Sequence, residues 1–179
     1  MKNTLKGLGL ATLAAATTVV SSLPAQARSN NEHHKVLAQT IVELGVNLKV
    51  NVAKCDERNA WGWYWSYGNE MVICQENRIP GSTKMVGWTE EDYDTLRHEA
   101  HHLVQDCMDR RQNGQLASVY KDPIALVKGT LSSSMIEDIL KAYSKESDHI
   151  KLMELEAFSV SALNNPLDQV NDIKRFCFS

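Results

Sequence analysis

The chain has 179 residues, with 19 basic and 22 acidic side chains and a net charge of −3. This acidic balance argues against a nucleic-acid-binding protein, which usually presents a basic surface. No segment after the first 27 residues is long and apolar enough to span a bilayer.

Residues 1–27 have the composition of a secretory signal peptide. Two lysines precede an apolar run, and the small-residue sequence Ala25-Gln26-Ala27 follows it. We expect cleavage after Ala27, which leaves a single secreted or periplasmic domain, residues 28–179, with a net charge of −5. A retained membrane anchor is the alternative, and the threonines, serines and Pro24 of the run disfavour it. Membrane contact is then expected only through the signal peptide, before cleavage.

The exported part contains an even number of cysteines, which favours two disulfides. Four cysteines allow three pairings, and the sequence alone does not choose among them. Two of them flank an expected hairpin and could join its strands, which would leave the other two to pair: Cys55 with Cys74, and Cys107 with Cys177. A zinc site built from cysteines is disfavoured because no C-x-x-C spacing occurs.

The first half of this domain reads as a helix followed by a small antiparallel sheet. Apolar residues at near-helical spacing predict an amphipathic helix over residues 31–46. Alternating apolar residues over 46–52 predict a strand, and residues 59–77 predict a hairpin with its turn at Gly68-Asn69.

The second half is predicted to be helical. Thr89 is a suitable N-cap for the first of these helices, and Pro166 ends the last long one. A short final helix carries Cys177, and the four helices before it cover residues 89–108, 123–129, 134–145 and 147–165. The outline is an α+β domain: an N-terminal helix, a small antiparallel sheet, a motif helix and C-terminal helices.

The motif helix contains the sequence HEAHH. At 3.6 residues per turn His98 and His102 lie about 40° apart on one face, with Glu99 beside them. This is the H-E-x-x-H arrangement, in which two imidazoles bind one zinc ion and the glutamate acts as a general base. His101 lies off this face and is expected to be an exposed flanking residue. The opposite side of the helix is apolar and faces the core, through Leu96, Ala100, Leu103, Val104 and Cys107.

Zinc enzymes usually supply three protein ligands and leave the fourth position to water. A third histidine at the spacing H-E-x-x-H-x-x-G-x-x-H is absent, so we expect a glutamate from a later helix. Glu154 and Glu156 lie about 200° apart around that helix, and only one can face the metal. We favour Glu156, because its apolar neighbours would make an unpaired carboxylate costly to bury, and we keep Glu154 as the alternative. Asp106 either orients a histidine ligand or is a solvated surface acid.

With these residues the chain resembles the gluzincins, the zinc peptidases with two histidines and a distant glutamate. The segment HEAHHLVQDC has the motif and an acid four residues after its second histidine, as in thermolysin-like enzymes. EAFS at 156–159 is similar to the sequence around the family's third ligand, and NAW at 59–61 with GNEMV at 68–72 is similar to its edge strand and hairpin. The similar patches fall within residues 46–163.

The resemblance implies a zincin-like core, a zinc cofactor and a peptide or protein substrate that lies along the edge strand. It also implies that Asn59 and Ala60 offer backbone groups to the substrate. One departure is that no histidine or tyrosine closely follows Glu156 to stabilise the oxyanion. The remaining candidates for that role are Tyr120, Tyr143, His149 and Arg175.

The sequence therefore predicts a secreted zinc-dependent peptidase. Zinc held by His98, His102 and Glu156 lowers the pKa of a bound water, and Glu99 transfers its proton to the leaving amine. The alternative is an exported, non-catalytic module that binds zinc, or binds a peptide or sugar, on the same fold. In that case Trp61, Trp63 and Trp65, which share one face of a strand, would form an aromatic platform. Otherwise these tryptophans pack in the core against the motif helix.

Overall fold

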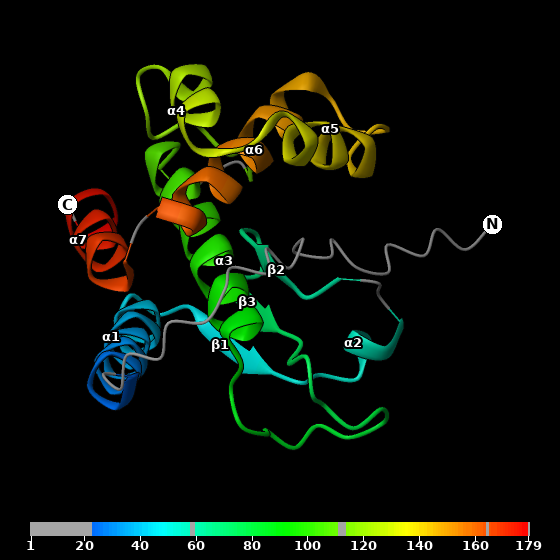
Figure 1. The fold of residues 1–179 in the computed structure, drawn as a ribbon, viewed down its shortest axis with the longest axis vertical. Helices are drawn as coiled ribbons and strands as arrows, with labels where there is room; N and C mark the ends of the chain where they lie inside the picture. Colours follow the sequence, from blue (N-terminus) through cyan, green and yellow to red (C-terminus); the bar gives the residue numbers. More distant parts are fainter. Residues whose placement is uncertain (1–22, 58–59, 111–113, 164, 179) are drawn as a thin grey trace.

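One helix, α3 (Glu90–Met108), contacts the small sheet on one side and the C-terminal helices on the other (Figure 1). The computed structural model describes residues 23–57, 60–110, 114–163 and 165–178, with the side chains of 23–30 left aside. The expected α+β class is confirmed. The other elements, in chain order, are α1 (Leu23–Glu43), β1 (Asn47–Val50), α2 (Lys54–Glu57), β2 (Gly62–Trp65), β3 (Glu70–Ile73), α4 (Pro123–Thr130), α5 (Ser133–Ala142), α6 (Asp148–Leu163) and α7 (Pro166–Cys177).

The sheet is mixed, which corrects the expectation of an antiparallel sheet. Its strand order is β1-β3-β2, with β2 antiparallel to β3 across the predicted hairpin. β1 pairs with β3 in parallel, with Leu48 opposite Met71. The alternation of apolar residues in β1 indicates which face of the strand turns toward the core. It indicates neither the neighbouring strand nor the strand direction, because these depend on residues outside the strand.

Local sequence signals place α3 as expected. Thr89 and Asp92 form a capping box, in which each side chain accepts a hydrogen bond from the other residue's backbone N–H. The apolar stripe of α3 packs against α1, α7 and β3. This main core contains Leu37 and Ile41 of α1, Met71 and Ile73 of β3, Leu96, Ala100, Leu103 and Val104 of α3, and Val170 and Ile173 of α7.

The N-terminal helix is longer than predicted. α1 covers Leu23–Glu43, so the expected cleavage point after Ala27 falls within it, while residues 1–22 of the predicted signal peptide lie outside the described residues. Within the described ranges, no helix combines the length and apolar character needed to cross a membrane. α1 packs beside α7, so the first and the last helix of the described chain are neighbours (Figure 1).

The later helices agree with the predictions to within a few residues. α4, α5 and α6 occupy the three expected segments, and the Ser147 side chain accepts a hydrogen bond from the backbone of Ile150. Pro166 begins α7 at the position where proline is most favourable in a helix, with Asn165 as the N-cap. The final helix, expected to be short, therefore extends over 12 residues and ends at Cys177.

The tryptophans of the hairpin do not pack against the motif helix, which corrects that reading. Trp63 packs with Val72 and the Cys55–Cys74 pair on the sheet face that points away from α3. Trp61 and Trp65 are 42% and 54% exposed. The neighbouring side chain that does reach α3 is Tyr64, whose hydroxyl donates to Asp106 at 2.7 Å.

Both preferred disulfides are present. Cys55 pairs with Cys74, and Cys107 at the end of α3 pairs with Cys177 at the end of α7. The first bridge closes a loop of 19 residues and the second a loop of 70 residues. A crosslink restricts the unfolded chain more when the loop that it closes is longer.

We predict that removing the Cys107–Cys177 bridge destabilises the protein more than removing the Cys55–Cys74 bridge. The double alanine variants should lose about 4 and about 3 kcal/mol of unfolding free energy, respectively, by the loop-entropy relation. Denaturant unfolding of the oxidised proteins, followed by circular dichroism, measures both values. A larger loss for the 19-residue loop would contradict the argument.

Candidate metal centre

Two histidines of α3 form the first part of the site. His98 and His102 lie one helical turn apart, and both are almost fully buried. Their Nε2 atoms are 3.0 Å apart, and the two rings meet edge to face. Both nitrogens therefore point toward one location, as the H-E-x-x-H spacing predicts.

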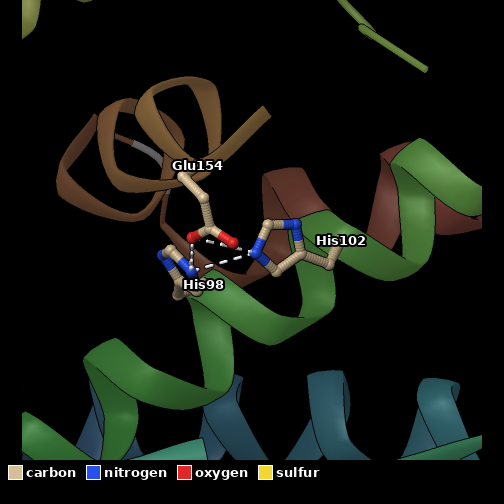
Figure 2. Close-up of side chains that lie close together, drawn as sticks. All are labelled: His98, His102 and Glu154. Atoms are coloured by element: carbon tan, nitrogen blue, oxygen red, sulfur yellow. Dashed lines mark hydrogen bonds and ion pairs between the residues drawn. The ribbon is translucent and has the colours of Figure 1, made fainter. Parts of the chain in front are cut away.

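The third member is Glu154 of α6, whose carboxylate lies over the two imidazoles (Figure 2). Its Oε2 is 3.2 Å from Nε2 of His98 and 3.5 Å from Nε2 of His102. Around a tetrahedral zinc ion with bonds of about 2.0 Å, neighbouring ligand atoms lie about 3.3 Å apart. The three measured distances are close to this value, so His98, His102 and Glu154 form a group that could bind a metal ion.

Glu156 does not face this group, which corrects the preference for it as third ligand. It is fully buried, and its carboxylate contacts His101, Gln105, Ser118 and Val119. The cost of burying its charge is offset by these hydrogen bonds, without a metal. The apolar neighbours of Glu156 correctly indicate burial, but burial does not distinguish a metal ligand from a carboxylate paired with protein donors.

His101 is buried as well, contrary to the expectation of an exposed flanking residue. Its exposed fraction is 0%, and its Nε2 lies 2.9 Å from Oε1 of Glu156. Burial lowers the pKa of His101, although the nearby Glu156 opposes this effect. Sequence reasoning also missed Gln105, and the signal was the spacing: His101 and Gln105 repeat the i, i+4 pattern of the metal histidines beside them.

Glu99 lies at the bottom of a pocket of about 200 Å³ between β2, α3 and α6, which Leu116 and Tyr143 also line. It is buried, and the backbone N–H of Tyr64 donates to it, yet its Oε2 has no hydrogen-bond partner among the described residues. Burial raises the pKa of Glu99 above that of an ordinary carboxyl, although His98 and His102 oppose the shift. A buried carboxylate oxygen that has no hydrogen-bond partner among the described residues is a candidate proton acceptor.

The approach of β2 to Glu99 depends on Gly62. A Cβ atom at this position would lie 2.7 Å from Thr95 Cγ2, 2.8 Å from the carbonyl oxygen of Val72 and 3.3 Å from Glu99 Cγ. The first two distances are shorter than real contacts, so the strand could not remain in place. Glycine therefore keeps the edge strand of the sheet within reach of the metal centre.

The ligand group holds opposite charges when no metal is bound. Burial disfavours a charged His102, but the Glu154 carboxylate outweighs it and raises the pKa of His102 to about 9. For Glu154, burial is likewise outweighed by the two histidines, which bring its pKa well below the ordinary range. A cation that binds here must therefore displace a proton from His102.

Tyr143 at the end of α5 is the one oxyanion candidate, of the four considered, that lines the pocket. Its hydroxyl donates a hydrogen bond to Glu154, and burial together with that carboxylate raises its pKa, so it stays protonated. His149 instead contacts the carbonyl of Leu116, Arg175 lies over Phe176, and Tyr120 lies near His101.

The remaining predicted residues are placed as follows. Asp106 is buried and accepts from Tyr64, so it is not a solvated surface acid. Nδ1 of His102 instead contacts Oε1 of Gln105, at 2.8 Å. Ala60 is exposed and precedes β2, whereas Asn59 lies outside the described residues.

Comparison with known proteins gives a family but no described activity. No curated protein matches the chain, and no solved structure matches it. One family model covers residues 25–178, nearly the whole described chain, including both histidines and Glu154. The protein therefore belongs to the family described as a domain of unknown function, DUF8637.

Proposed function

We propose that this protein is a zinc-dependent peptidase with a zincin-like core. The observation that carries the proposal is the triangle of His98, His102 and Glu154, which lines one pocket together with Glu99. The buried Oε2 of Glu99 has no hydrogen-bond partner among the described residues. Two imidazoles and one carboxylate are a common ligand set of catalytic zinc. Three protein ligands would leave one coordination position of the ion for water, and all three of these residues line the pocket.

The bound cation would polarise a substrate carbonyl and lower the pKa of a coordinated water. The chain's own residues supply the remaining chemistry. Glu99 accepts a proton at its free Oε2, and its raised pKa makes it a stronger base than a solvated carboxylate. It then returns that proton to the leaving amine of the cleaved peptide bond.

Tyr143 is placed to stabilise the negative charge that develops on the carbonyl oxygen. Its hydroxyl stays protonated and lies at the ligand group, because it already contacts Glu154. A donor aimed at the developing oxyanion is commonly worth a factor of about 100 or more in rate. This assigns the oxyanion role to α5, and not to a residue that closely follows the third ligand.

The edge strand β2 is the proposed binding surface for the peptide substrate. It is the outer strand of the sheet, and Gly62, Trp63 and Tyr64 line the pocket. An extended peptide can add to such an edge through backbone hydrogen bonds. The strand would then hold the scissile bond against Glu99 and the cation.

Export of the domain belongs to the same proposal. Two disulfides are compatible with an oxidising compartment. The predicted signal sequence adds a route to that compartment, with secretion or a periplasmic location as the result.

A second function is favoured by the exposed indoles of Trp61 and Trp65. Exposed tryptophans on one strand face could bind a peptide or a sugar without cleaving it, with the metal serving a structural role. The peptidase function requires Glu99 for peptide cleavage, whereas the binding function does not require Glu99.

We predict that zinc affinity rises with pH. Because Glu154 raises the pKa of His102 to about 9, zinc competes with a proton at neutral pH. The apparent association constant should increase about tenfold for each pH unit below 9 and level off above it. Competition with a chromogenic chelator at pH 6.5, 7.5 and 8.5 measures this dependence. An affinity that is constant over that range would contradict the protonated ligand pair.

We predict that Glu99→Gln abolishes peptide cleavage but retains zinc. The amide cannot accept the proton, so kcat should fall by a factor of about 100 or more. Mass spectrometry of a mixed peptide library after incubation with zinc-loaded protein measures cleavage. Glu91→Gln, at the start of the same helix, is the control and should keep both properties. If zinc-loaded wild-type protein leaves the whole library intact, the binding-module function is favoured instead.

We predict that Tyr143→Phe lowers kcat by a factor of about 100 or more with little change in KM, because its hydroxyl acts on the developing oxyanion. Zinc content is measured alongside, since the same hydroxyl contacts Glu154. Tyr67→Phe, at a tyrosine that is 74% exposed, is the control. A rise in KM at unchanged kcat would instead assign Tyr143 to substrate binding.

A further inference from the structure

A second buried polar cluster lies against the metal centre. Its members are His101 and Gln105 of α3, Glu156 of α6 and Ser118 of the segment before α4, and we call it the Glu156 cluster. The two glutamates of α6 thus have different surroundings: Glu154 contacts the metal histidines and Glu156 contacts this cluster. The proposed peptidase chemistry makes no use of it.

The Glu156 carboxylate is held by four donors. Its Oε1 lies 2.9 Å from His101 Nε2, 3.1 Å from Gln105 Nε2 and 3.0 Å from the backbone nitrogen of Val119, and its Oε2 accepts from Ser118. The backbone N–H of Val119 can only donate, so Oε1 of Glu156 acts as a hydrogen-bond acceptor.

These contacts determine the orientation of the Gln105 amide. Its Nε2 lies 3.1 Å from Oε1 of Glu156 and 3.1 Å from the carbonyl oxygen of Met153. Both partners are acceptors, so the NH2 group must point to them and the amide oxygen must point the other way. That oxygen lies 2.8 Å from Nδ1 of His102.

The amide oxygen cannot donate, so Nδ1 of His102 must carry the hydrogen of this bond. A neutral imidazole with a hydrogen on Nδ1 has its lone pair on Nε2, the atom that points toward His98 and Glu154. We propose that Glu156, acting through Gln105, fixes the tautomer and ring orientation of His102 as a metal ligand. This inference rests on the proposed metal site, and it makes Gln105 and Glu156 positioning residues.

The same cluster also holds the segment that contains the pocket residue Leu116. The backbone nitrogen of Ala117 donates to the backbone carbonyl of Gln105 at 3.1 Å. Ser118 and Val119 donate to the carboxylate of Glu156. A purely structural role for Glu156 would act through this segment. The role in metal binding acts through the Gln105 side chain, so variants can separate the two.

The first test uses Gln105→Met, which keeps the side-chain size and removes all three hydrogen bonds of the amide. Loss of such a supporting partner should weaken zinc binding about 10- to 100-fold in chelator competition. Glu156→Gln should weaken it as well, because the new side chain can turn its NH2 group toward Gln105 and remove the acceptor that Oε1 supplies. The visible spectrum of the cobalt-loaded variants should shift, which a change in folding stability alone would not cause.

Three further variants serve as references. Gln169→Met removes another fully buried glutamine that donates to the α3 backbone, and it should lower stability without changing zinc affinity. Ser118→Ala removes the donor to Oε2 of Glu156 but leaves the Gln105 contacts with Glu156 and Met153 in place, so it should weaken zinc binding less than Gln105→Met does. Glu154→Gln removes a proposed ligand and should lower affinity most. If Glu154→Gln binds zinc as well as wild type, the metal site is wrong; if only Gln105→Met does, the positioning role is wrong.

One measurement needs no variant and therefore no assumption about folding. In zinc-loaded wild-type protein, nitrogen-15 NMR of the histidine rings reports which nitrogen carries hydrogen. We expect His102 to have its hydrogen on Nδ1 and its metal contact at Nε2. Coordination through Nδ1, or a hydrogen on Nε2, would overturn the inference.

Discussion

The packing of α6 against α3 is the contact on which the candidate site depends. α3 contributes only His98 and His102 to the ligand group, so a three-ligand metal site needs a residue from another element. α6, which is separated from α3 by α4 and α5 in the sequence, contributes two carboxylates, Glu154 and Glu156. Charges in a helix interface are costly unless they are paired, so each carboxylate requires its own partners on α3.

α3 meets this requirement by dividing its surface into regions of different chemistry. One side is apolar and faces the sheet, α1 and α7. A second holds His98 and His102 opposite Glu154, and a third holds His101 and Gln105 opposite Glu156. Gln105 connects the second and third regions, because its two amide atoms contact a histidine of one and a carboxylate of the other.

The features that the sequence predicts correctly depend on residues that lie close together in the chain. The Thr89–Asp92 capping box, the hairpin turn at Asn69 and the i, i+4 pair of His98 and His102 each depend on local spacing alone. The partner of β1 and the choice between Glu154 and Glu156 depend on how distant elements meet. Both glutamates lie beside apolar residues, and only the way in which α6 crosses α3 decides which one reaches the histidines.

The site is costly for stability, and the structure offsets this cost at both ends of α3. His98, His102 and Oε2 of Glu99 are buried on α3, a helix that must not shift if the two histidines are to converge with Glu154. At its start, Asp92 caps the helix and also accepts from the backbone of Glu76, just beyond the central strand. At its end, Cys107 is covalently joined to α7. Fixing both ends holds the histidines in position between them, which is what a preorganised metal site needs.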